Sequence, residues 1–137
     1  MTNQTRITLP KPIYLYTALL GIFGIGMGLW SAISPMGMFE IGKMTLDGTG
    51  RDMIIYLFAA RNFAFGILFL LALMKYRTKE VFLTIYIARL ILDIADTLAI
   101  GVVGMMGIDR LLEQLLFLVP VPIIIYYLTK VESKNQS

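Results

Sequence analysis

One stretch of the chain, IYLYTALLGIFGIGMGLWSAI at residues 13–33, runs for 21 residues without a charged side chain. A helix needs about 20 apolar residues to cross the hydrocarbon core of a bilayer, which is about 30 Å thick. The stretch is also longer than the core of a secretory signal peptide, about 7–15 residues, so we expect a retained helix. It therefore predicts a transmembrane span, and with it an integral membrane protein.

Three further apolar runs indicate that this span has neighbours. They cover about residues 53–74, 81–103 and 111–128, and an outer connection covers 34–52. Hydrophobic residues make up 58% of the chain and charged residues 15%, whereas soluble domains average about 45–50% and about 25%. Pro120 and Pro122 lie inside the last run and predict a kink there. We expect an all-α fold: one domain, 1–137, formed by a bundle of four transmembrane helices.

The positions of the basic residues predict how the bundle is oriented. Seven lysines and arginines fall in the N-terminal tail, in the turn KYRTKE at 75–80 and in the C-terminal tail, and three fall in the connections on the other side. The richer side is normally cytoplasmic. We therefore expect both termini inside, in a multi-pass protein of the cell membrane whose first partner is the lipid bilayer. The net charge of +3, clustered at segment ends, does not indicate nucleic-acid binding.

Glycines recur along the first run and predict how it packs. A dinucleotide-binding glycine motif needs a strand before it and a soluble βαβ unit around it, and neither surrounds these glycines. Gly21, Gly24 and Gly28 instead form a small-residue face, on which a second helix can approach closely. The sequence leaves open whether that helix is another span or a second copy of the chain in a homo-oligomer.

Polar and ionisable residues interrupt the later runs and mark the candidate site. A charge at the centre of a bilayer costs about 2.5–3.5 kcal/mol, so it is expected to face the bundle interior. In the third run, Arg89, Asp93 and Asp96 are spaced by four and three residues, which places them on one helical stripe. The full set of ligand-binding or polar-cluster candidates is Arg61, Asn62, Tyr86, Arg89, Asp93, Asp96 and Glu113.

Counting depth from the turn near residue 76 predicts partners for these charges. At about 1.5 Å per residue, Arg61 lies within about one helical turn of both Arg89 and Asp93. An Arg61–Asp93 pair between the second and third runs is therefore expected, and Arg89 can pair with Asp93 in its own helix. Asp96 lies further toward the outer side, at the level of Glu113. Such a cluster is either a lock between helices or a binding site, and five ionisable residues favour the binding site.

Residue types that are missing restrict the chemistry. The chain has no Cys and no His, so thiolate nucleophiles, imidazole bases and Cys or His metal ligands are excluded. The arginines beside the carboxylates argue against a metal site, and no cofactor is expected. Catalytic residues are not assigned. We expect binding of a lipid or small molecule; the alternatives are a small dimeric transporter or channel, and an isomerase-like membrane enzyme acting on a lipophilic substrate through its acidic residues.

Three motifs in order carry a family resemblance: GIFGIGMGLWSAISP, FAARNFAFGILFLL and RLILDIADTLAI. The chain resembles small four-helix bacterial and fungal membrane proteins of unknown function over about residues 18–100, and more distantly the DoxX-like proteins. In that group a Gly-rich first helix ends in Pro, the second holds an Arg-x-x-x-x-Gly element and the third a late Asp. Arg61 and Gly66 match the second element, and Asp93 or Asp96 the third. The resemblance implies a helical bundle without an established activity.

Overall fold

The computed structural model describes residues 6–34, 50–103 and 118–131, and the side chains of 6–34, 55–98 and 118–131. Their helices are α1 (Lys11–Ile33), α3 (Gly50–Met74), α4 (Lys79–Val103) and α6 (Pro120–Lys130). An isolated antiparallel bridge between Arg6 and Thr78 is the only strand-type pairing within these ranges. The described part of the chain is therefore all-helical, as predicted. α1 and α3 end at the predicted residues 33 and 74, α1 and α4 begin two residues earlier than predicted, and the described part of α4 reaches residue 103.

Prolines determine where two of the helices begin. α1 follows Pro10 and has Pro12 in its first turn, where the missing N–H of proline breaks no helical hydrogen bond. α6 likewise begins at Pro120, with Pro122 in its first turn. Leu118 is helical and Val119 has helical backbone angles, so helical backbone also precedes Pro120, and the kink predicted at Pro120 and Pro122 stays a prediction. Residues 111–117 of the predicted span lie outside the described ranges.

Within the described residues, two helices have the length and apolar composition to cross a membrane: α1 and the part of α3 from Ile55 to Met74. α4 holds Arg89, Asp93 and Asp96 within its 25 residues, and the described length of α6, 11 residues, is about 16 Å of helix, roughly half of a bilayer core. Four crossings and the orientation of the termini therefore stay predictions.

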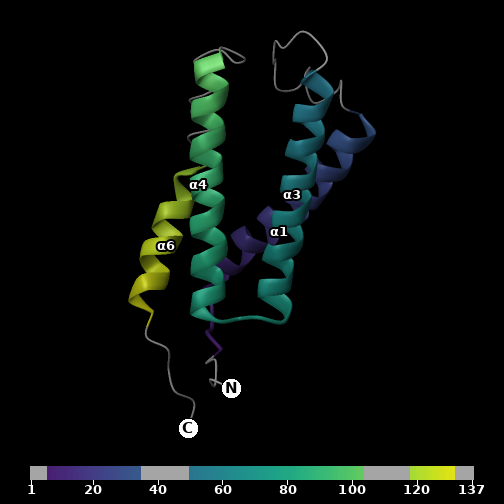
Figure 1. The fold of residues 1–137 in the computed structure, drawn as a ribbon. Coiled ribbons are helices and arrows are strands. Elements are labelled where there is room, and N and C mark those ends of the chain that lie inside the picture. Colours follow the sequence, from purple (N-terminus) through teal and green to yellow (C-terminus); the bar gives the residue numbers. More distant parts are fainter. Residues whose placement is uncertain (1–5, 35–49, 104–117, 132–137) are drawn as a thin grey trace.

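α1 packs closely against α3 through the predicted glycine face, while α4 runs antiparallel to α3 and α6 lies against α4 (Figure 1). Gly21, Gly24 and Gly28 are buried. A Cβ on Gly24 would lie 2.8 Å from the backbone oxygen of Asn62, and a Cβ on Gly66 would lie 2.6 Å from the backbone nitrogen of Ile25. The two backbones nearly touch, so the glycine face of α1 contacts α3 of the same chain.

The hydrophobic core joins all four helices near the α3–α4 turn. Phe69, Phe82, Tyr86 and Leu128 are among its most buried side chains, each at most 2% exposed. The Tyr86 hydroxyl shares a 2.7 Å hydrogen bond with the Thr17 hydroxyl of α1. Beyond Tyr86, none of the described α4 side chains up to residue 98 is buried. Along α4 the buried core therefore reaches from Phe82 to Tyr86, and the described part of the helix extends past it.

Three segments meet at that end of the molecule (Figure 1). The Ile7 amide donates a 2.8 Å hydrogen bond to the Arg77 carbonyl in the α3–α4 turn. The Lys79 ammonium donates to the carbonyls of Thr129 and Val131, at 3.1 and 2.9 Å, where α6 ends. We call this region the basic end, defined by Arg6, Lys11, Lys75, Arg77, Lys79 and Lys130.

Candidate functional site

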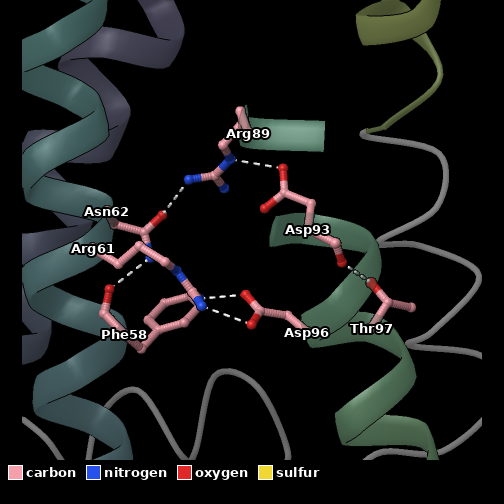
Figure 2. A network of polar contacts seen from close by, with 7 residues as sticks. All are labelled: Phe58, Arg61, Asn62, Arg89, Asp93, Asp96 and Thr97. Carbon is pink, nitrogen blue, oxygen red and sulfur yellow. Dashed lines mark hydrogen bonds and ion pairs between the residues drawn. The ribbon is translucent and has the colours of Figure 1, made fainter. Parts of the chain in front are cut away.

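One stripe of α4 supplies half of the candidate site. Arg89 Nε donates a 2.6 Å hydrogen bond to Asp93 Oδ2, forming an ion pair between residues four apart (Figure 2). The Thr97 hydroxyl donates to the backbone carbonyl of Asp93 at 2.7 Å. A helix brings residues at these spacings to one face. Arg89 and Asp93 are thus paired within their own helix, which the spacing predicted.

Arg61 on α3 pairs with Asp96, so the predicted Arg61–Asp93 pair is wrong. Arg61 Nη1 donates to Asp96 Oδ1 at 2.6 Å, and Nη2 contacts Oδ2, which makes the pair bidentate (Figure 2). Side chains lean toward the N-terminus of their helix. In antiparallel helices Arg61 therefore leans away from the α3–α4 turn and Asp96 leans toward it. The prediction compared the depths of Cα atoms only. It took no account of the two side chains leaning toward each other, or of the length of the arginine side chain.

Asn62 on α3 connects that helix to Arg89 on α4. Its Oδ1 accepts a 3.0 Å hydrogen bond from Arg89 Nη1, and its Nδ2 donates to the Phe58 carbonyl at 2.9 Å. Asn62 is 6% exposed, because Gly24 lets α1 lie directly on this part of α3. The glycine face thus holds the Asn62 side chain toward α4. We call the linked residues the polar network: Arg61, Asn62, Arg89, Asp93 and Asp96.

The polar network balances its own charge and is partly shielded. It holds two arginines and two aspartates, and its four charged side chains keep only 18–28% of their surface exposed. Each guanidinium also lies over an aromatic ring of α3: Arg61 is 5.3 Å from the Phe58 ring centre, and Arg89 is 5.7 Å from that of Phe65. Cation–π contacts of this kind stabilise an arginine where water is scarce.

Arg89 is the branch point of the polar network. It donates through Nε to Asp93 Oδ2 and through Nη1 to Asn62 Oδ1. Figure 2 shows the second Asp93 oxygen directed toward α3. Arg89 thus connects its own helix to α3 one helical turn beyond the buried Tyr86.

The remaining predicted residues lie elsewhere. Tyr86 is one turn from Arg89, but its ring packs 5.1 Å from that of Phe69 and its hydroxyl bonds to Thr17, so it belongs to the core. Glu113 lies outside the described residues. Sequence reasoning missed Tyr16 on α1, whose hydroxyl is subject to the charges of Asp93 and Arg89.

Nothing in the sequence pattern pointed to Tyr16, since a tyrosine among apolar residues near the end of a span is common. As for metal chemistry, no group of three or more acidic side chains suited to a metal ion occurs among the described residues. Each aspartate of the polar network instead has an arginine as its partner. The arrangement can therefore bind and orient a polar group, and it contains no evident nucleophile.

Comparison with protein-family models, with curated proteins and with solved structures gives no match to this chain. The functional inference therefore rests on the chain's own residues. The Arg61–Gly66 element that carried the family resemblance serves two faces of α3: Arg61 joins the polar network, and Gly66 contacts the backbone of α1.

Proposed function

We propose that the chain is a multi-pass membrane protein of the cell membrane that binds a lipid or small molecule through the polar network. In this proposal four spans cross the bilayer and both termini lie in the cytoplasm. Two apolar helices of spanning length support the membrane location. The meeting of residue 6, the α3–α4 turn and the end of α6 at one end of the molecule supports an even number of crossings.

The topology is testable because the chain has no Cys, so an introduced one is a unique label. Lys75→Cys lies at the exposed basic end, and Gly48→Cys lies in the predicted outer connection. In intact cells a membrane-impermeant maleimide is expected to label Gly48→Cys only. Lys75→Cys should react once the cells are permeabilised. Equal labelling of Lys75→Cys before and after permeabilisation would contradict the orientation.

The binding proposal rests on one observation: Arg89 and Asp93, two charged side chains that are only 22% and 18% exposed, pair within α4, where the pair is not needed to join two helices. Charge-assisted hydrogen bonds of this kind are strong and can be shared with a ligand. A ligand group that both donates and accepts, such as a hydroxyl, an amide or a protonated acid, suits such a pair.

A purely structural role explains one ion pair better than the other. The Arg61–Asp96 pair links α3 to α4 and so fixes their register. The Arg89–Asp93 pair lies within α4 and contacts α3 through two uncharged side chains, Asn62 and the ring of Phe65. Ionisable residues within spans are costly, and they mark functional sites by default. The second pair is therefore the part of the polar network that we assign to the ligand.

The test is to identify a lipid or small molecule that stays bound to the protein during purification. Purified in a mild detergent, the wild-type chain is expected to carry a specific lipid or metabolite, detected by mass spectrometry after denaturation. Arg89→Gln and Asp93→Asn should each lower its occupancy at least tenfold, the loss expected when one of these charge-assisted hydrogen bonds, worth about 1.5–3 kcal/mol, is removed.

The control separates lost binding from lost stability. Leu128→Val changes a fully buried side chain of α6 and should destabilise the protein by about 1 kcal/mol while the ligand stays bound. Two results would overturn the proposal: wild-type protein that retains only the lipids of the bulk membrane, or Arg89→Gln protein that retains the ligand at wild-type occupancy.

A further inference from the structure

Positive charge without a partner is concentrated at the basic end. Away from that end, the arginines with described side chains are Arg61 and Arg89, and each is neutralised by an aspartate. The basic end holds six lysines and arginines contributed by four segments of the chain, and Glu80 is its one acidic residue within the described ranges. The excess charge of the described side chains thus lies on a single surface.

Most of these cations face outward. Two of the six form hydrogen bonds to backbone carbonyls. Arg77 Nε donates to the Leu73 carbonyl at the end of α3, and the Lys79 ammonium donates to carbonyls at the end of α6. The side chains of the other four carry no hydrogen bond to the described protein, and all four are exposed. These four are Arg6, Lys11, Lys75 and Lys130.

Tyrosine rings accompany the cations. Lys75 lies 5.5 Å from the Tyr76 ring centre, and Lys130 lies 5.6 Å from that of Tyr126. On α1 the Tyr14 ring centre is 5.6 Å from the Arg77 guanidinium. Tyrosine beside lysine or arginine is the composition that settles at the headgroup level of a bilayer, where an apolar ring and a charge are both accommodated.

We propose that the basic end is a binding surface for the headgroups of anionic phospholipids in the leaflet that it faces. The inference rests on the membrane location proposed above and is independent of the polar network. Clustered cations beside a membrane are attracted to anionic lipid, with a gain of about fivefold in affinity for each lysine or arginine. Folding brings together charges that lie more than a hundred residues apart in the chain, and so creates this cluster.

The experiment compares phosphatidylglycerol with phosphatidylcholine of the same acyl chains, titrated onto the full chain in a neutral detergent and followed by native mass spectrometry. The wild type is expected to bind phosphatidylglycerol on the order of 100-fold more tightly, about fivefold for each of three exposed lysines. In the triple variant K11Q/K75Q/K130Q the affinity for phosphatidylglycerol should fall by that factor, down to the affinity for phosphatidylcholine. The variant K11R/K75R/K130R keeps the charge and should keep the preference.

Two further measurements test the effect of charge at the basic end and distinguish a lipid ligand from a soluble phosphate. Glu80→Gln, which removes the acid of the basic end, should tighten phosphatidylglycerol binding by about fivefold. Soluble glycerol 1-phosphate at the same concentration should not compete. The proposal is overturned if the two lipids bind wild-type protein equally, if the glutamine variant keeps the preference, or if glycerol 1-phosphate competes fully. Failure of the maleimide test would instead change only the leaflet that the basic end faces, and an empty polar network would leave this result unchanged.

Discussion

Arg61→Leu is expected to lower the free energy of unfolding by about 3 kcal/mol, because it leaves the Asp96 carboxylate without its bidentate partner. Breaking a buried pair costs about 3–5 kcal/mol. Exposures of 25% for Arg61 and 28% for Asp96 place this pair at the lower end of that range. Asp96→Leu leaves the Arg61 guanidinium without its partner and should lower the free energy of unfolding by a similar amount. Chemical denaturation in mixed micelles measures both values.

The double variant R61L/D96L provides the decisive comparison. It removes both charges together, so no uncompensated ion remains within the bundle. We expect it to be more stable than either single variant, by at least 1 kcal/mol, since a paired charge replaced by packed apolar side chains is often neutral. If the two single losses simply add in the double variant, the ion pair does not act as a link between α3 and α4.

Gly66→Ala is expected to have a comparable effect for a steric reason. Its Cβ would lie 2.6 Å from the Ile25 amide nitrogen and 2.7 Å from the Gly21 carbonyl oxygen. Both are backbone atoms that cannot rotate away, so the helices must separate. Overpacking of this kind costs about 1–3 kcal/mol. The same measurement of unfolding should show a loss of about 2–3 kcal/mol, and Gly24→Ala should behave alike.

Gly26→Ala is the matched control for Gly24→Ala, since both glycines lie on α1. A Cβ at Gly26 would meet nothing within 4 Å, so we expect a change within about 0.5 kcal/mol, or a slight gain because alanine favours the helix. A loss at Gly26 equal to that at Gly66 would show that the glycines matter for the helix itself and not for the contact between α1 and α3.

The sequence predicted the helices that are continuous in apolar residues and bounded by clear signals. The ends of α1 and α3 at 33 and 74 matched, because a proline follows the first apolar run and a short polar turn follows the second. α6 was harder to place. It begins at Pro120, inside an apolar run that starts well before this residue, and hydropathy does not show where in a helix a proline stands.

The candidate site was predictable to the extent that it is local. The i,i+4 spacing of Arg89 and Asp93 specifies their pair, since helix geometry alone brings them together. The partner of Arg61 depends on which way side chains lean between two antiparallel helices, and counting residues gave Asp93 where the structure has Asp96. The link through Asn62 depends on the approach of α1 at Gly24, a tertiary contact that no spacing encodes.

The place of Leu128 in the core has a consequence for how the protein is made. This side chain, fully buried against the other helices, lies about 42 residues after Tyr86. At the usual rate of about 5–20 residues per second, synthesis of that interval takes roughly 2–8 seconds. During that time the faces of α3 and α4 near their turn have been made, but the residue that covers them has not. Closure of the core therefore waits for the segment that carries Leu128, and is completed only when this segment has left the ribosome.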